Sequence, residues 1–420
     1  MMIPAPRIFL ASLFDAAVKA ADPQTGIAAH LPEKPRGKTV VIGAGKGAAQ
    51  MASALERLWK GPIHGVVVTR YGYGCKTNSI EIIEAAHPVP DAAGLIASKR
   101  LTDAIKDLSE DDLVIALICG GGSALLPAPP KPLTLDNEIV LNETLLASGA
   151  PISAMNVVRK HLSTIKGGRL AAATKARVVS LIVSDIPGDN AAYVASGPTV
   201  ADNSTRHEAL EIVARYNLKL PKAAIDHLNS TGADAPRADN PIFSRNSHHI
   251  IASASVSLEA AAAVSRSSGI EAVILSDSVE GEARDVALVH AAIAKGVFER
   301  NRPFGKPVVI LSGGETTVTL KSRHGKGGRN SEFALAAALA IDGRDIHVLA
   351  ADTDGIDGTG DNAGAFADGT TVARLRVAGF DPRQLLDTND SYTGFKNIDD
   401  LFKTGPTGTN VNDFRAMLIS

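Results

Sequence analysis

Cysteine is scarce in this sequence, and its spacing does not suit a metal site. The 420 residues contain two cysteines, Cys75 and Cys119, which lie far apart and form no C-x-x-C motif. A scaffold held by disulfides and a metal site built on cysteine are therefore disfavoured.

Aromatic residues, net charge and long apolar runs are also lacking. Only 4% of the residues are aromatic, which argues against a stacking platform for bases or sugars, and the formal charge of -2 gives no electrostatic footprint for nucleic acid. No apolar run approaches the ~20 residues that span a bilayer. The apolar start from Ile8 to Phe14 is followed at once by Asp15, which favours a first helix over a signal peptide. We therefore expect a cytoplasmic protein with no nucleic-acid or membrane partner.

The length of the chain predicts two domains, because 420 residues exceed one ordinary core. The stretch 229–247 is rich in turn residues, so we place the boundary there, with a glycine-loop domain at residues 1–235 and an α/β domain at residues 236–420. Apolar, β-rich runs alternate with helical patterns, which predicts a parallel sheet with helices on both faces. The strands that we expect are 39–42, 65–69, 80–84, 113–118, 178–183, 249–252, 272–275, 308–311 and 346–351.

Several predicted strands end in glycine or aspartate. Gly43 to Gly47, Gly120 to Ser123 and Asp185 each follow a strand of the first domain. Loops at the carboxyl ends of parallel strands share one edge, where ligands of such sheets bind. These three loops therefore predict a binding site.

The first of these loops combines three glycines with a lysine. A strand, a glycine loop and a helix aim backbone N–H groups and the positive helix end at an anion, and Lys46 adds a charge. Gly43, Gly45 and Ala48 also fit a loose dinucleotide fingerprint, but Arg70 stands where the acidic ribose partner is needed. This disfavours NAD and leaves NADP as an alternative. Tight packing alone would explain the glycines but not the lysine.

No Walker A or protein-kinase motif is present, so any phosphoryl chemistry must use another architecture. The loop Gly120-Gly121-Gly122-Ser123 lacks the second glycine of a nucleophile elbow, because Leu125 takes its place. It is better interpreted as an anion nest, with a simple tight turn as the alternative.

Charged residues gather in three further places. Asn156, Arg159, Lys160, Lys166 and Arg169 lie within ~15 residues and either line a site or form a solvated helix face. The other two are the aspartate turns after strands and the helix start at residues 327–330. The aspartates could hold Mg²⁺ or only form turns, and the arginine of the helix start suits a carboxylate or phosphate. The aspartate turns contain Asp185, Asp189, Asp352, Asp354 and Asp357, and the helix start contains Gly327, Gly328, Arg329 and Asn330. His87 and His161 are interpreted as turn or core residues.

Together these segments resemble the class II glycerate kinases, the glycerate 2-kinase family once labelled hydroxypyruvate reductases. The resemblance runs in order along nearly the whole chain. The matching segments are VIGAGKG (41–47), GGGSA (120–124), NVVRKHLS (156–163), SDIPGD (184–189), ASGPT (195–199), SGGETTV (312–318), GGRNSE (327–332) and DTDGIDG (352–358).

The resemblance implies a Rossmann-like N-terminal domain with a mostly parallel sheet, a smaller α/β C-terminal domain, and an active site in the cleft between them. It also implies a kinase that uses ATP and Mg²⁺, or another divalent cation, to phosphorylate D-glycerate at the 2-hydroxyl. The expected partners are these small-molecule substrates, and association of two copies of the chain into a homodimer is an open alternative. An NADPH-dependent hydroxypyruvate reductase and a non-catalytic binding module are the alternatives.

Residue roles follow from matching the motifs to the family and from the chemistry of the loops. Lys46 and Arg329 match positions taken as catalytic, and Asp189 is the carboxylate that we expect to take the hydroxyl proton, although Asp185 could exchange roles with it. The metal ligands that we expect are Asp185, Asp352 and Asp354. The residues expected to bind substrate or nucleotide are Gly43, Gly45, Gly47, Gly120, Gly121, Gly122, Ser123, Asn156, Arg159, Lys160, Glu315, Gly328 and Asn330.

Overall fold

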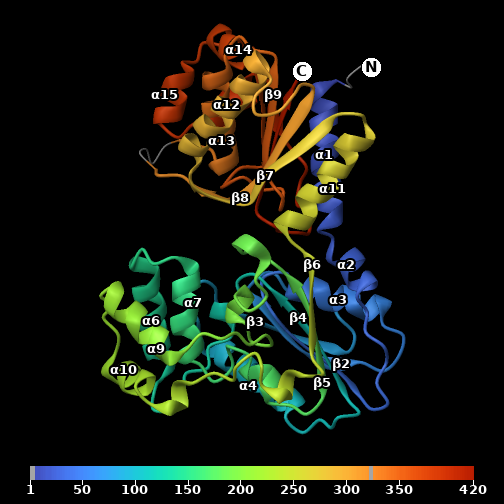
Figure 1. Ribbon diagram of the computed structural model, residues 1–420, viewed down its shortest axis with the longest axis vertical. Helices are drawn as coiled ribbons and strands as arrows, with labels where there is room; N and C mark the ends of the chain where they lie inside the picture. Colours follow the sequence, from blue (N-terminus) through green and yellow to red (C-terminus); the bar gives the residue numbers. More distant parts are fainter. Residues whose placement is uncertain (1–4, 321–324) are drawn as a thin grey trace. The chain divides into compact units, whose positions relative to one another are not determined.

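The computed structural model describes residues 5–320 and 325–420, and it divides into two compact units (Figure 1). One unit is Pro23–Ile251, and the other joins Met1–Asp22 to Ala252–Ser420. The sequence places the division at residues 235 and 236 instead. The N-terminal segment changes unit because Leu10, Leu13 and Phe14 of helix α1 (Pro6–Ala20) pack into the core of the second unit.

The unit Pro23–Ile251 contains the Rossmann-like sheet that the sequence predicts. Its strands follow the order β3-β2-β1-β4-β5-β6, and the pairs from β3 to β5 are parallel. Every residue of β1 and β4 is buried, which for β4 is what its continuous apolar run predicts. The strand order reverses between β1 and β4, and this switch point is where ligands of such sheets bind. The strands are β1 (Thr39–Ala44), β2 (His64–Arg70), β3 (Ile80–Ala85), β4 (Leu113–Cys119), β5 (Arg177–Val183) and β6 (Ser247–Ala252).

Helices complete this unit. Asp91 caps α4 by accepting a hydrogen bond from the Gly94 amide, and α4 packs on the sheet. A separate apolar cluster joins α6, α7, α9 and α10 beside the sheet. The helices are α2 (Pro23–Ala29), α3 (Ala48–Leu58), α4 (Ala92–Ile105), α5 (Gly122–Leu125), α6 (Leu135–Ala147), α7 (Ile152–His161), α8 (Arg169–Ala172), α9 (Arg206–Arg215) and α10 (Lys222–Leu228), with short 3-10 turns at Pro187–Asp189, Val194–Ser196, Thr231–Ala233 and Pro241–Phe243.

The second unit has a mixed sheet of order β11-β10-β9-β12-β8-β7. β7 and β8 are parallel, and the other neighbouring pairs are antiparallel. Two expectations are corrected: the predicted strand 249–252 belongs to the first unit as β6, and the three strands after β9 were not predicted, including β12, which lies between β8 and β9. The strands are β7 (Glu271–Glu282), β8 (Val308–Thr317), β9 (Ile346–Asp352), β10 (Gly364–Asp368), β11 (Leu401–Phe402) and β12 (Asp413–Ile419).

Helices cover both faces of this sheet (Figure 1). Ile310, Val348 and Met417 pack with α12 and α13, whereas Leu311 and Leu418 pack with α1 and α11, as period-2 strands require. The remaining helices of this unit are α11 (Ala254–Ser267), α12 (Ala283–Arg300), α13 (Arg329–Ile341), α14 (Thr371–Val377), α15 (Pro382–Asp387) and α16 (Ser391–Asn397).

The predicted α/β class with a smaller second domain is thus confirmed, while the predicted cleft stays a prediction. Across the described residues, no helix combines the length and apolarity that a membrane span requires.

Candidate functional site

The loops after β1, β4 and β5 meet at the switch point of the first sheet, as predicted. The structure shows this through the two glycines that begin the second loop. A Cβ on Gly120 would overlap the Asp185 carboxylate, and a Cβ on Gly121 would lie 3.0 Å from Cγ of Lys46. Lys46, Gly120, Gly121 and Asp185 therefore form one local group.

The backbone N–H groups of the first glycine loop are already used. The amide of Gly45 donates to Val68 O at 3.1 Å, that of Lys46 to Gly120 O at 2.8 Å, and that of Gly47 to Cys119 Sγ at 3.2 Å. These bonds tie the loop to β2 and β4, so the expectation that its amides point at an anion is wrong for these three. Gly43 lies within β1, where a Cβ would come within 2.7 Å of Leu117 O, so it serves close strand packing.

The second glycine loop fits an anion nest better than the first. Gly121 has φ +82°, a backbone conformation that glycine adopts without strain, and it precedes α5. Within residues 5–320 and 325–420, no acceptor is recorded for the amides of Gly121 and Gly122. Two donors are thus available next to Lys46.

Lys46 itself has a partly buried side chain and an available charge. Its carbonyl accepts a hydrogen bond from Thr69 Oγ1 at 3.0 Å, which fixes the backbone. Its ammonium group forms no ion pair with any residue in the described part of the chain. A cation that is held by its backbone but not neutralised can bind an anion.

His87 belongs to this group, although the sequence interpretation placed it in a turn or core. It follows β3 at the same sheet edge, and its Nε2 would lie 3.1 Å from a Cβ on Gly121. Burial, with the charges of Lys46 and Arg70, lowers the pKa of His87 to about 4. Its position just after a strand of the parallel sheet was the signal that could have identified it.

Polar residues of α7 are connected to the second glycine loop by hydrogen bonds. Ser123 Oγ lies 2.7 Å from Ser196 Oγ, which donates to Asn156 Oδ1 at 3.0 Å. Arg159 donates to the same Asn156 oxygen at 3.3 Å and has a lowered pKa because of burial. These hydrogen bonds link α7 to the second glycine loop.

Lys160, Lys166 and Arg169 are occupied by the protein. Lys160 is fully buried, pairs with Asp202 and lies 4.5 Å from the centre of the Tyr193 ring. Lys166 pairs with Glu138 at 2.8 Å, and Arg169 donates to backbone carbonyls. The structure therefore does not place these cations with Lys46, and their contacts here hold the fold.

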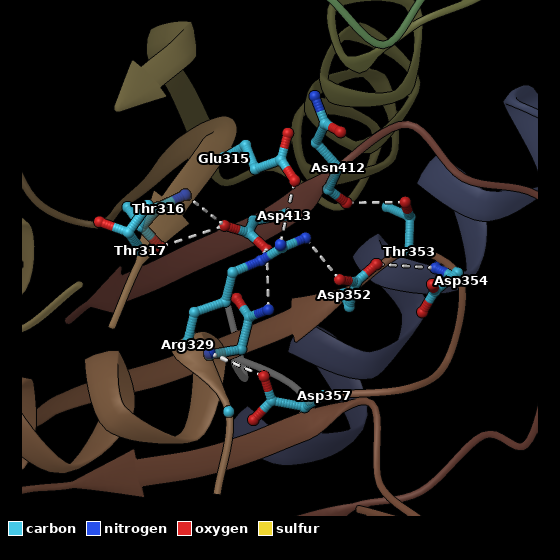
Figure 2. A network of polar contacts seen from close by, with 12 residues as sticks. Glu315, Thr316, Thr317, Arg329, Asp352, Thr353, Asp354, Asp357, Asn412 and Asp413 are labelled. Carbon is cyan, nitrogen blue, oxygen red and sulfur yellow. Dashed lines mark hydrogen bonds and ion pairs between the residues drawn. The ribbon is translucent and has the colours of Figure 1, made fainter. Parts of the chain in front are cut away.

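Arg329 of the second unit lies among three carboxylates (Figure 2). Nε donates to Asp413 at 2.6 Å, Nη2 to Asp352 at 2.6 Å, and Nη1 to Glu315 at 3.2 Å. Burial opposes the charge, but these carboxylates together raise the pKa of Arg329. The Glu315 side chain is 57% exposed, whereas that of Asp413 is 0% exposed, so Glu315 is the partner that a ligand can replace.

Asp413 is a site residue that the sequence interpretation missed. Besides Arg329, it accepts hydrogen bonds from Asn330 Nδ2 at 2.8 Å and from the amide and hydroxyl of Thr316 at 3.2 Å. It also pairs with Arg415, which is fully buried and whose pKa burial lowers. Asp413 thus connects β12, β8 and the start of α13.

The start of α13 is already capped by a carboxylate. Asp357 accepts from the amides of Asn330 at 2.9 Å and Ser331 at 2.8 Å, and a Cβ on Gly328 would collide with it. The expectation of a second anion site built like the first is therefore wrong for these amides, although Arg329 remains accessible. Asn330 donates hydrogen bonds to Asp413 and Asp357, and the absence of a side chain at Gly328 leaves space for the Asp357 carboxylate.

The predicted metal ligands belong to both units: Asp185 follows β5 in the unit Pro23–Ile251, whereas Asp352 and Asp354 lie at the end of β9 in the other unit. Asp352 accepts from Arg329 and from the Asp354 amide, and burial raises its pKa to about 8 against the attraction of Arg329. Asp354 accepts from the Ile356 amide at 2.8 Å. In the part of the chain that the structure describes, no set of three or more acidic, histidine or cysteine side chains is arranged to hold a metal ion. Asp189 follows β5 in a short turn, with φ +52°, near the loop of Asp185.

Comparison with known proteins covers nearly the whole chain. A family described as a domain of unknown function, DUF4147, matches residues 9–229, and the MOFRL family matches residues 308–413. An Agrobacterium vitis protein with the name "Putative hydroxypyruvate reductase" is 49% identical over 98% of this chain and 94% of its own. Glycerate 2-kinase of Pyrococcus horikoshii is 41% identical over 92% of this chain and 88% of its own. The crystal structure of glycerate kinase from Thermotoga maritima superposes with a TM-score of 0.89, at 36% identity, over 99% of both chains.

Proposed function

The chain belongs to the glycerate 2-kinase family, and on this premise we propose that it transfers the terminal phosphoryl group of ATP to the 2-hydroxyl of D-glycerate. The products are 2-phosphoglycerate and ADP. The bond between the 2-oxygen and phosphorus forms, the bond from that phosphorus to the β-phosphate oxygen breaks, and the hydroxyl proton leaves to a carboxylate.

The observation that supports this proposal best is the unpaired charge of Lys46 beside two available amides. Phosphoryl transfer needs positioning and positive groups around the transferring phosphoryl more than it needs covalent chemistry. Lys46 and the amides of Gly121 and Gly122 offer a cation and two donors to the same oxyanion. In the proposal they bind a phosphate of ATP or the carboxylate of D-glycerate.

Arg329 is the second proposed cation. Its fork suits two oxygens of a carboxylate or phosphate, and the exposed Glu315 holds one side of that fork at 3.2 Å. An incoming anion would take the place of Glu315, while Asp413 and Asp352 keep the guanidinium oriented. The guanidinium of Arg329 would then bind the anion in an orientation that is already fixed.

Asp185 and Asp189 are the proposed carboxylates of the reaction. One accepts the proton of the 2-hydroxyl, and the other contributes to a divalent cation. Mg²⁺ bound with a nucleotide commonly uses one or two protein carboxylates, and phosphate oxygens and waters complete its shell. Asp185 fits this need at the glycine loops, and Asp354 is the second candidate, whereas both oxygens of Asp352 have partners. When bound, the metal would neutralise phosphate charge.

The test is a reaction of the purified full chain with ATP, Mg²⁺ and D-glycerate, followed by ³¹P NMR. We expect ADP and a phosphorus resonance of 2-phosphoglycerate in equal amounts. A 3-phosphoglycerate signal would correct the regiochemistry, and the absence of ADP formation would overturn the kinase.

A hydroxypyruvate reductase is the second candidate, favoured by the name of the relative from Agrobacterium vitis. It needs Arg70 for the NADP phosphate, but the Arg70 guanidinium lies over the Tyr73 ring at 3.7 Å. NADPH absorbance with hydroxypyruvate tests this candidate in the same preparation, and we expect no oxidation. A cytoplasmic location and a homodimer stay predictions of the sequence.

A further inference from the structure

His87 differs from the buried histidines His161 and His290 in the hydrogen bonding of its ring nitrogens. His161 has Ala233 O at 2.8 Å and Ser204 Oγ at 3.3 Å from its two nitrogens, and His290 has Val286 O at 2.8 Å and Ser312 Oγ at 2.9 Å. These rings are satisfied within the protein. For His87, which is only partly buried, the described residues provide no hydrogen-bond partner to either nitrogen.

The ring of His87 is directed at the glycine loop. A Cβ on Gly121 would lie 3.1 Å from His87 Nε2 and 3.0 Å from Lys46 Cγ, so both side chains reach the same glycine. The Gly121 amide, for which the described chain records no acceptor, belongs to that same residue. A ligand oxygen that occupies the space beside Gly121 would therefore meet the imidazole as well as Lys46.

Burial, together with the charges around the ring, keeps it neutral. Lys46 and Arg70 are the charged groups that act on His87, and with burial they lower its pKa to about 4. A neutral imidazole next to two cations still has an N–H group to donate and adds no further positive charge.

We infer that His87 is a further substrate-contacting residue of the glycine-loop site, and that its Nε2–H donates a hydrogen bond to an oxygen of the anion that Lys46 binds. The ligand class is an oxyanion, either a phosphate of a nucleotide or the carboxylate of a small hydroxy acid. The choice between these two sources rests on the proposed function, whereas the contact itself does not.

Two substitutions separate the ring nitrogens. In His87→Gln the side-chain amide can reach the place of Nε2, whereas in His87→Asn it reaches only the place of Nδ1. We expect the asparagine variant to weaken binding of one ligand about 10- to 100-fold, as loss of a hydrogen bond to a charged group does, and the glutamine variant to stay close to the unsubstituted protein. His207→Gln, on the exposed face of α9, makes the same chemical change away from the loop and should alter nothing.

Isothermal titration of each protein with ATP and, separately, with D-glycerate gives the readout. A weaker Kd for ATP alone assigns the contact to a phosphate, and a weaker Kd for D-glycerate alone assigns it to the carboxylate. If the asparagine variant binds both ligands as the unsubstituted protein does, the inference is overturned. Because titration measures binding and not turnover, a missing kinase reaction would refute the proposed function while leaving this result intact.

A measurement on the unsubstituted protein covers the case in which a variant does not fold. With ¹⁵N-labelled histidine, the Nε2 resonance of His87 should move when the full chain is saturated with the ligand that it contacts. An unchanged resonance at saturation with both ATP and D-glycerate would also overturn the inference.

Discussion

Arg329 donates from Nη2 to Oδ2 of Asp352 across 2.6 Å, which joins the first residue of α13 to the last residue of β9. The guanidinium is thereby fixed before any substrate is present. Because its other partners differ in exposure, the cluster has one permanent side at Asp413 and one replaceable side at Glu315. This arrangement lets one arginine serve both the fold and the proposed reaction.

Lys46→Ala should reduce turnover about 100- to 1000-fold, as expected when one group that stabilises developing charge is removed. Its ammonium makes no ion pair with the described residues, so the melting temperature should stay unchanged. Steady-state assays of ADP release and thermal unfolding measure the two effects. Lys60→Ala, at an exposed position, is the matched control. Full activity in the Lys46 variant would remove Lys46 from the site.

Arg329→Lys should keep the positive charge but lose the planar guanidinium with its three donor nitrogens. A lysine cannot contact Asp413, Asp352 and Glu315 at once, so we expect turnover to fall by at least about tenfold and stability to fall by about 2 kcal/mol. Urea unfolding and ADP release are the measurements. Arg344→Lys changes an arginine in an exposed pair with Glu299 and should leave both quantities as they are. Equal behaviour of the two variants would show that the fork has no special role.

Asp413→Asn should destabilise the second unit strongly. The fully buried Arg415 would lose its charge partner, and breaking one side of a buried pair costs about 3–5 kcal/mol. The free energy of unfolding from a urea titration tests this. Asp226→Asn breaks the exposed pair with Lys222 and should not move the midpoint. A midpoint for the Asp413 variant close to that of the control would contradict the structural role given to Asp413.

Gly45→Ala should be far more costly than Gly72→Ala, although both residues have positive φ. An added Cβ at residue 45 collides with Cys119 Sγ and the Cys119 carbonyl, whereas at residue 72 it meets open space. We expect a loss of about 1 kcal/mol at residue 72 from backbone strain, and of about 2–4 kcal/mol at residue 45 from strain and overpacking. Chemical denaturation of both variants measures the loss in the free energy of unfolding. Equal losses in the two variants would refute the close contact between residue 45 and Cys119.

His87 should make the fold sensitive to mild acid. Its pKa is lowered from 6.5 to about 4 in the folded chain. Between these values the unfolded chain binds a proton that the folded chain does not, so the free energy of unfolding falls as pH falls. His87→Gln lacks this contribution, and its stability should therefore decline less than that of the unsubstituted protein between pH 7 and pH 4. Parallel decline of the two curves in urea titrations would mean that His87 is not held neutral.

The sequence predicted the parts of the structure that depend on local patterns. A β-rich run identified β1 and a continuous apolar run identified β4, and the glycines after them located the switch-point edge where Lys46 and Gly121 meet. Chain polarity alone places these loops together once the sheet is parallel. The same reasoning, applied to His87 after β3, would have included it.

Long-range pairing could not be predicted from the same patterns. β12 was missed because the charges of Asp413 and Arg415 interrupt its apolar pattern, and only the buried ion pair explains them. Lys160 was expected to bind substrate, but nothing local in the sequence reveals that Asp202 neutralises it. The Gly45 and Lys46 amides resemble those of an anion loop until their acceptors are known, which are Val68 O on β2 and Gly120 O just after β4.

The position of β12 has a consequence for how a newly made chain matures. Phe14 of α1 packs edge-on against Phe414 of β12, with ring centroids 5.7 Å apart, so the second unit joins two elements that are far apart in the sequence. Nascent chains fold as they leave the ribosome, and the early segments usually fold first. Here α1 emerges before β12 and must wait for it, and Asp413 reaches Arg329 only when β12 has been made. A nascent chain stalled before residue 413 therefore has an unfinished second sheet and an arginine that is not yet held in place.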